Sequence, residues 1–394
     1  MRTIILMVTC FSIISPAFGE WTMMDKEWQS GIVSGWSGYP GNIPASHSLS
    51  MRANGAPCVA WEAWKGVRFG SDIGCACWDD GWGRWVGPQD GQFIDFVGLS
   101  GFNAKAVLLA LPSNQFVIAA INRPVLNTGT DKPKVIVLTF DGGSWGYTYG
   151  LTHGCTANCG DAEMNVAIAT DPLGGYGQAV SDGRRIRYVA PSGSVEVVIP
   201  RAAGVVTSIK LQYEPSGVAH ISYGGVTVGG SIEARHVYRV GPGNWTGYTG
   251  ASDLFERSST VGLDINQASG EVSVGLVNTG RLIVHSYTGS WSTRIVNPTG
   301  DVAEDDLDLR YDGSGRLYVG WASDTQPGLL LLRRVGSSWE NMTGGATPEV
   351  VLSIPWGTPH PTIGFDLGDN PHSVFGWSDD VGHRRWKNIP LLEQ

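Results

Sequence analysis

The stretch DLDLRYDGSGRLYVGW at residues 306–321, followed by LLLLRRVGSSW at residues 329–339, shows the pattern that decides the fold. It contains an apolar run, a glycine turn, a second run that ends in tryptophan, a variable loop, a third run and a turn that closes on tryptophan. Short apolar runs bounded by glycine-rich turns are typical of β-strands joined as hairpins. The pattern recurs, and the tryptophans that close three successive copies, Trp245, Trp291 and Trp339, are 46 and 48 residues apart.

Six copies of this unit are clear in the sequence. Their first hairpins lie at residues 48–61, 105–120, 207–223, 260–276, 306–321 and 360–377. A seventh copy at residues 165–199 keeps the strand rhythm without a tryptophan and fills the long step between Trp145 and Trp245. A repeat of about 45 residues with several short strands is typical of one β-propeller blade. We therefore expect an all-β protein in which residues 20–394 form a single domain, a seven-bladed β-propeller of four-stranded antiparallel blades.

The last copy of the repeat lacks one strand. The chain ends soon after the strand expected near residues 382–392, whereas an alternating apolar stretch at residues 21–36 precedes the first copy. An unpaired strand edge would invite aggregation. We therefore expect residues 21–36 to pair with residues 382–392 as the outer strand of the last blade, so that an N-terminal strand closes the ring.

Residues 1–19 have the features of a secretory signal peptide. Arg2 provides the positive charge, residues 3–15 form an apolar run, and a pattern of small residues ends at Gly19. The apolar run is too short to cross a bilayer, and no later stretch is long and apolar enough to do so. We expect cleavage after Gly19 and a secreted protein, extracellular or periplasmic, that is a monomer without membrane insertion.

The composition disfavours several classes of partner. Only 16% of the residues are charged, whereas the chain contains 55 Gly and 16 Trp, which is the opposite of the balance in disordered proteins. The formal charge is −9, or −10 once Arg2 is removed with the leader, and there is no run of basic residues. A net acidic chain of this kind is not expected to bind nucleic acid or an anionic membrane.

Five cysteines remain after removal of the leader, and disulfides are permitted after export. Cys58 and the pair Cys75 and Cys77 fall on adjacent strands of one expected hairpin. Facing residues on antiparallel strands are close enough for a disulfide. We therefore expect Cys58 to pair with Cys75 or with Cys77, and Cys155 to pair with Cys159 across one loop, which leaves one thiol over.

A zinc site is the alternative for the second cysteine pair. His153 and Asp161 lie beside Cys155 and Cys159 in the sequence. A structural zinc site needs four ligands at recognisable spacings, and no second cysteine pair stands at such a distance. We therefore expect neither a metal nor another cofactor.

TFDGGSW at residues 139–145 resembles the Ser/Thr-x-Asp-x-Gly-x-Thr-Trp box of the sialidase-like (BNR/Asp-box repeat) β-propeller superfamily, although it is one residue short. WDDGWGRW at residues 78–85 and GSSW at residues 336–339 are more degenerate versions of the box. The resemblance covers most of the mature chain as an architecture. In that family the box is a structural turn on the face away from the active site, so the resemblance implies the fold and says little about chemistry.

One face of the expected propeller is the candidate for function. The loops between the second and third strands share this face with the loops between blades, and both surround the mouth of the central channel. Arg, His and Trp recur in these loops, and the residues expected to bind the ligand are Trp64, Arg68, Arg123, Arg184, Arg281, His47 and His360. The planar guanidinium fork of arginine recognises carboxylates and sulfates. We expect an extracellular carbohydrate, in particular an acidic one, to bind there.

Two enzymatic interpretations stay open beside a non-catalytic binding protein, which is favoured. A sialidase would have an arginine triad, a tyrosine nucleophile and an early Arg-Ile-Pro segment, but the chain offers only INRPV at residues 121–125. Some polysaccharide lyases that act on uronic acids also use seven-bladed propellers, with His, Tyr and Arg near the channel. That resemblance would make His47, His153 or His360 the base and an arginine the group that neutralises the substrate carboxylate.

Overall fold

The computed structural model describes most of the repeat region. The described residues are 47–64, 71–81, 84–89, 95–97, 102–123, 132–152, 164–182, 185–199, 204–227, 232–246, 258, 260–297, 307–323, 328–353, 361–377 and 380–385. Their strands form seven antiparallel sheets, and within each sheet consecutive strands pair in sequence order. No helix among these residues is long and apolar enough to cross a membrane.

The first three sheets cover residues 47–199. Their strands are β1 (His47–Met51), β2 (Pro57–Trp64), β3 (Ser71–Asp79), β4 (Arg84–Val86) and β5 (Asp95–Val97); β6 (Phe102–Leu111), β7 (Gln115–Arg123), β8 (Lys134–Phe140) and β9 (Trp145–Thr152); and β10 (Asn165–Thr170), β11 (Tyr176–Ser181), β12 (Ile186–Val189) and β13 (Val195–Ile199). A short 3-10 turn, η1 (Pro112–Asn114), links β6 to β7. β5 pairs with β3 as a fifth strand of the first sheet.

The other four sheets cover residues 204–385. Their strands are β14 (Gly204–Tyr213), β15 (Ala219–Thr227), β16 (Ile232–Gly241) and β17 (Asn244–Thr246); β18 (Val261–Ile265), β19 (Val272–Asn278), β20 (Arg281–Tyr287) and β21 (Trp291–Asn297); β22 (Leu307–Tyr311), β23 (Leu317–Ser323), β24 (Gly328–Val335), β25 (Ser338–Glu340) and β26 (Glu349–Ser353); and β27 (Thr362–Phe365), β28 (Pro371–Trp377) and β29 (Asp380–Arg385). β26 pairs with β24 as a fifth strand of the sixth sheet.

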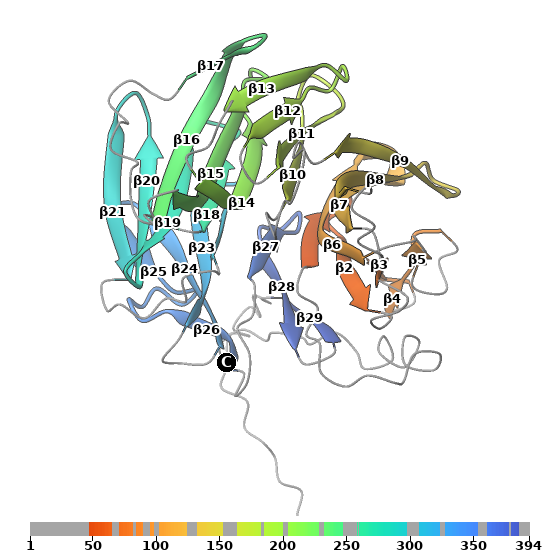
Figure 1. Cartoon of the computed structure of the whole chain (residues 1–394). Coiled ribbons are helices and arrows are strands. Elements are labelled where there is room, and N and C mark those ends of the chain that lie inside the picture. Colours follow the sequence, from red (N-terminus) through yellow and green to blue (C-terminus); the bar gives the residue numbers. More distant parts are fainter. Residues whose placement is uncertain are drawn as a thin grey trace, which may run out of the picture.

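The first strands of the sheets contact one another in a closed order. β1 contacts β6, and the contacts continue through β10, β14, β18, β22 and β27, which contacts β1 again. Figure 1 shows the sheets arranged around a common axis with these inner strands at the centre. The chain therefore folds as a β-propeller.

The prediction of seven four-stranded blades is correct only in part. Among the described residues, six blades contain the four-stranded antiparallel path, two of them with an additional fifth strand, while the seventh sheet, β27–β28–β29, has three strands. Residues 21–36, expected to complete this sheet, lie outside the described residues, and among those that are described no N-terminal strand pairs with β29. The inner strands β27 and β1 are in contact instead. Sheet faces can pack across this seam without sharing a strand, which is why the ring order is complete without the predicted pairing.

Alternation along the inner strands separates an apolar face from a polar one. In β22, Leu307 and Leu309 are buried in a cluster with Trp321 of β23. Because successive side chains of a strand point to opposite faces, Asp308 and Arg310 lie on the other face. The packing that holds the blades together thus also fixes where the charged residues of β22 point.

The predicted Asp box is a structural turn. Asp141 Oδ1 accepts hydrogen bonds from the main-chain N–H groups of Gly143, at 2.9 Å, and Ser144, at 3.0 Å, between β8 and β9. These bonds hold the pKa of Asp141 below its usual range. The same type of side-chain cap occurs in the first turns of several sheets, at Asp171, Asn266, Asp312 and Asp366. All these turns lie at the end of the propeller opposite to the starts of the inner strands, so the box has no place in a channel-mouth site.

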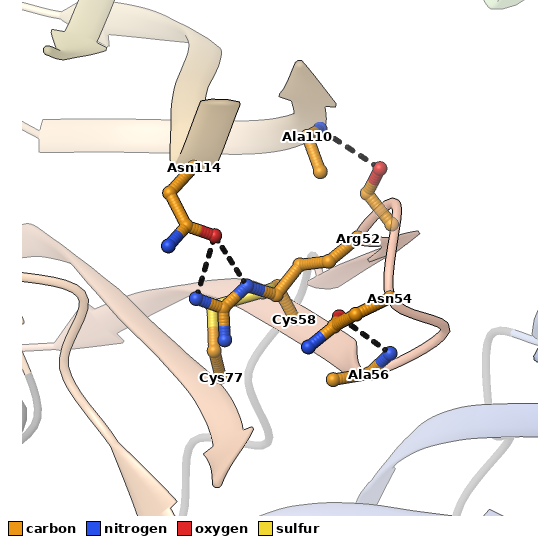
Figure 2. Close-up of a disulfide and its surroundings, with 8 residues drawn as sticks. Arg52, Asn54, Ala56, Cys58, Cys77, Ala110 and Asn114 are labelled. Carbon is orange, nitrogen blue, oxygen red and sulfur yellow. Dashed lines mark hydrogen bonds between the residues drawn. A yellow bond between two sulfur atoms is a disulfide. The ribbon is translucent and has the colours of Figure 1, made fainter. Parts of the chain in front are cut away.

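One of the expected disulfides is present, and register selects the partner. Cys58 of β2 faces Cys77 of β3, and the two form a disulfide with Cα atoms 4.0 Å apart (Figure 2). Cys75 faces Ala60 instead and is buried outside the disulfide, so pairing of Cys58 with Cys75 is wrong and the alternative, Cys77, is correct. Cys155 and Cys159 lie outside the described residues.

A polar contact beside this disulfide joins the first two blades. Arg52, in the turn after β1, donates from Nε and Nη2 to Oδ1 of Asn114 in η1, at 3.1 and 2.8 Å (Figure 2). Ser50 Oγ accepts the N–H of Ala110 at 2.9 Å. These bonds tie β1 to β6 at the turn end of the propeller.

Candidate functional site

The inner strands enclose a channel with a volume of about 1230 Å³. Residues of β1, β6, β10, β14, β18, β22 and β27 line it. Ligand cavities of globular proteins usually measure about 300–1,000 Å³. The channel is therefore large enough to hold a sugar unit together with water.

Four charged side chains from three neighbouring blades meet in the channel wall, and we call them the channel charge cluster: Lys210 of β14, Asp264 of β18, and Asp308 and Arg310 of β22. Lys210 Nζ lies 4.0 Å from Asp308 Oδ1. Arg310 Nε lies 3.5 Å from Asp308 Oδ2, and Arg310 Nη1 lies 3.9 Å from Asp264 Oδ1. The side chains of Lys210 and Arg310 are 33% and 32% exposed, so both cations reach the space of the channel.

The two acids of the cluster are held by main-chain hydrogen bonds from the following segments. Asp308 Oδ2 accepts the N–H of Ile363 at 2.8 Å, and Asp264 Oδ2 accepts the N–H of Tyr311 at 2.6 Å. Burial raises the pKa of Asp264 to about 6, although Arg310 opposes the shift. Burial also lowers the pKa of Lys210, although Asp308 opposes that shift. Asp264 is therefore a group in the channel wall that gains or loses its charge near neutral pH.

A third cation enters the channel wall from a strained position. Lys105 has a φ of 57° and lies where the pairing of β6 with β7 shifts register. A non-glycine residue in this left-handed region costs about 1 kcal/mol or more, and β-bulges commonly re-aim a side chain near functional sites. Lys105 Nζ donates to Asn165 Oδ1 at 2.5 Å, and Asn165 Nδ2 donates to the carbonyl of Val206 at 2.7 Å. The bulge thus directs Lys105 across the wall toward the third and fourth blades.

The channel-mouth face, where the inner strands begin, carries the described members of the predicted site. Arg123 ends β7 and is half-buried, whereas Arg281 begins β20 and is exposed. Trp64 ends β2 on the same face. Arg68, Arg184, His153 and His360 lie outside the described residues. Of the predicted arginines, the described ones are Arg123 and Arg281, which come from two separate blades, and we call them the rim arginines.

His47 lines the channel, but its side chain is mostly enclosed. It begins β1, as expected, but it is only 8% exposed. Its Nε2 lies 3.1 Å from the carbonyl oxygen of Val374 in β28 and donates to it. The imidazole is therefore part of the contact between the first and seventh sheets, because β28 of the seventh sheet packs directly over it.

The predicted site residues lie mostly in loops, whereas the channel charge cluster lies on the inner strands β14, β18 and β22, and the sequence analysis did not identify it. A signal was nevertheless present in the aligned repeats. Gln212, Asp264 and Arg310 each stand two residues before the first turn of their repeat. Lys210 and Asp308 stand four residues before that turn. Polar residues at matching positions of strands that are otherwise apolar indicate a shared surface on the channel side.

No protein-family model matches the chain, and no curated protein matches it. Solved structures do match. A protein of unknown function from Dyadobacter fermentans has a TM-score of 0.51 at 12% identity, over 89% of this chain and 96% of that one. The polysaccharide lyase Uly1 has a TM-score of 0.51 at 11% identity, over 88% and 90%. Virginiamycin B lyase from Staphylococcus aureus has a TM-score of 0.50 at 12% identity, over 94% and 100%.

The shared feature is the β-propeller fold. Sialidases and an arabinanase are also among the similar solved structures. The β-propeller fold that the degenerate Asp boxes implied is confirmed by the arrangement of the sheets and by the structures with TM-scores of 0.50–0.51. At identities of 9–14% the likeness concerns the fold alone.

Proposed function

We propose that this β-propeller is secreted and binds an acidic carbohydrate at the channel mouth and in the channel below it. The observation that carries the proposal is the channel, whose lining includes Lys105, Lys210 and Arg310 from three blades. A cavity with a few convergent polar groups is the usual form of a ligand site. Because the chain carries a net charge of −9, an anionic ligand requires cations such as these at its binding site.

Three further observations support this proposal. The rim arginines Arg123 and Arg281 would add two cations at the channel mouth. Uly1, one of the structures with the same fold, is described as a polysaccharide lyase, which supports a polysaccharide as the class of ligand. The Cys58–Cys77 disulfide supports an oxidising compartment outside the cytosol, in agreement with the signal-like residues 1–19.

Lyase activity toward a uronic-acid polymer is the second candidate. Asp264 and Arg310 place a group that titrates near neutral pH beside a cation, which is the pairing that proton abstraction next to a carboxylate requires. The buried His47 offers less support for a base, because its Nε2 donates to a main-chain carbonyl. Formation of an unsaturated uronate product, followed by its ultraviolet absorbance, would distinguish the lyase from a binding protein.

The first test is a polysaccharide array with the purified mature protein, followed by calorimetry on each ligand that binds. We expect acidic polysaccharides to bind and their affinity to fall as salt is added, because exposed charges are screened beyond about 8 Å at physiological ionic strength. Replacement of Arg123 and Arg281 together by Ala should lower the affinity about fivefold, since each exposed ion pair contributes about 0.2–1 kcal/mol.

The matched control is Arg294→Ala. Arg294 lies on the outer strand β21, where it donates to the carbonyl of Ser337, so its loss changes the net charge without changing the rim. Equal affinity loss in the control and the rim variant would refute the rim assignment. Preference for neutral glycans over acidic ones would refute the proposed ligand class.

A further inference from the structure

The channel charge cluster differs from two of the cation–carboxylate pairs that join the blades. Arg239 meets Glu196 at 2.6 Å between the third and fourth blades, and Arg334 meets Glu271 at 2.7 Å between the fifth and sixth. Those are direct, charge-assisted hydrogen bonds. In the cluster, the corresponding nitrogen–oxygen distances are 3.5, 3.9 and 4.0 Å. These two pairs are therefore in direct hydrogen-bond contact, whereas the three contacts of the cluster are longer than a hydrogen bond.

The two acids of the cluster are held by main-chain hydrogen bonds, whereas its two cations make the longer contacts given above. Asp264 and Asp308 each accept a main-chain N–H within 2.8 Å, which fixes their position in the wall. Lys210 carries three N–H donors and Arg310 five. At the observed distances the two acids engage few of these donors, and about a third of each cationic side chain is open to the channel. An added anion would find donors from two blades.

We propose that Lys210 and Arg310 form a binding site for a single carboxylate group inside the channel, and that Asp264 competes with this carboxylate for Arg310. This inference rests on the proposed function, because the carboxylate would belong to the bound acidic sugar. The guanidinium of Arg310 can hold a carboxylate through two parallel hydrogen bonds, and the ammonium of Lys210 adds a point charge. Both cations approach Asp308, so they lie close enough to act on one ligand group.

The competition makes the affinity depend on pH. The charged groups that face Asp264 are Arg310 and Asp308 of β22, with Lys210 of β14 beyond Asp308. Its cross-strand neighbour in β19, Ser273, is uncharged. With both acids ionised, the cluster is neutral. Once Asp264 is protonated, at a pH below its raised pKa of about 6, the cluster has a net positive charge and Arg310 is released for the ligand.

A sugar carboxylate keeps its charge through this range, because an ordinary carboxyl group has a pKa near 4. Affinity for it should therefore rise as the pH falls from about 7.5 to about 5. We expect an increase of about tenfold, the factor that corresponds to about 1.4 kcal/mol.

The test uses free D-glucuronate as the probe and D-glucose as the neutral control, with the full mature protein at constant ionic strength. Calorimetry at about pH 5 and about pH 7.5 should show glucuronate binding that is about tenfold tighter at the lower pH, and no glucose binding. Arg310→Met and, separately, Lys210→Met should each weaken glucuronate binding at least about tenfold at the lower pH. Asp264→Asn should hold the affinity at the low-pH level at both pH values, which a merely structural role would not produce.

The outcomes separate this inference from the proposed function. Absence of glucuronate binding, or binding that Arg310→Met and Lys210→Met leave unchanged, would overturn the carboxylate site even if polysaccharides bind at the rim. A pH response that persists in Asp264→Asn would overturn the competition. Glucuronate binding without any polysaccharide binding would instead refute the proposed function and leave the channel site in place.

Discussion

Replacement of Asp264 by Asn is expected to raise the free energy of unfolding at neutral pH by up to about 3 kcal/mol and to leave it nearly unchanged near pH 4. Burial raises the pKa of this carboxyl to about 6 in the folded protein, from an ordinary value of 3.8. The folded state therefore binds the proton more tightly than the unfolded state. Each pH unit between the two pKa values corresponds to about 1.4 kcal/mol.

The sign of the effect follows from this linkage. As the pH rises from about 4 to about 6, the unfolded carboxyl ionises before the folded one, and the wild type loses stability through this group. Above about 6 the loss is complete. Asn has the shape of the neutral carboxyl and can still accept the N–H of Tyr311 through its amide oxygen. The variant therefore avoids this loss of unfolding free energy at every pH.

Urea denaturation of wild type and variant at several pH values would measure the effect. The difference in unfolding free energy should grow from near zero at about pH 4 to its full size above about pH 6. Asp141→Asn is the control of opposite sign, because hydrogen bonds from Ser144 and Gly143 lower the pKa of Asp141. A constant difference across the pH range would show that Asp264 is not a buried titrating group.

Loss of the Cys58–Cys77 disulfide is expected to lower the free energy of unfolding by about 3 kcal/mol. The bond joins residues separated by 19 positions, and the entropy of closing a loop of that length in the unfolded chain gives an estimate of this size. Both sulfurs also lie in the buried apolar cluster between the first and second blades, which includes Ile73 and Phe116. The double variant Cys58→Ala/Cys77→Ala should therefore melt at a lower temperature.

Reduction provides the internal check. A strong reductant should lower the melting temperature of the wild type and should have no effect on the double variant. Cys75→Ala is the matched control, because Cys75 is equally buried but lies outside the disulfide. This control should remain sensitive to reductant. A wild type that is insensitive to reductant would refute the stabilising role of the bond.

Local patterns in the sequence were sufficient to predict most of the fold. Glycine turns and closing tryptophans such as Trp291 and Trp339 locate the hairpins, and the spacing of the repeats gives the order of the sheets. Even the third blade, which lacks a closing tryptophan, was found from its strand rhythm at residues 165–199. Ring closure was not predictable in this way, because the contact of β27 with β1 depends on packing between distant sheets.

The candidate site was harder to predict for a related reason. Arg123 and Arg281 were expected in the loops of the channel-mouth face, and they lie at the end of β7 and the start of β20; their role in binding stays a prediction. The direction of the Lys105 side chain depends on a bulge and a positive φ, and no short sequence pattern predicts either feature. The partners of Lys210 and Arg310 come from other blades, so their meeting becomes visible only when inner strands converge on one axis. Likewise, the register of β2 against β3 determines that Cys58 pairs with Cys77 and not with Cys75.

The seam between the first and seventh sheets sets a constraint on how the protein is made. His47 and Val374 are 327 positions apart, and Val374 shares an apolar cluster with Leu49 and Trp61 of the first blade. A chain emerging from a ribosome or an export channel completes its first blade long before β28 exists. Until then the contacts that β28 makes with this apolar surface are missing, and contacts between distant parts of a chain form slowly. A product terminated before β27 would lack these contacts, which would mark unfinished molecules for proteolysis while intact ones escape it.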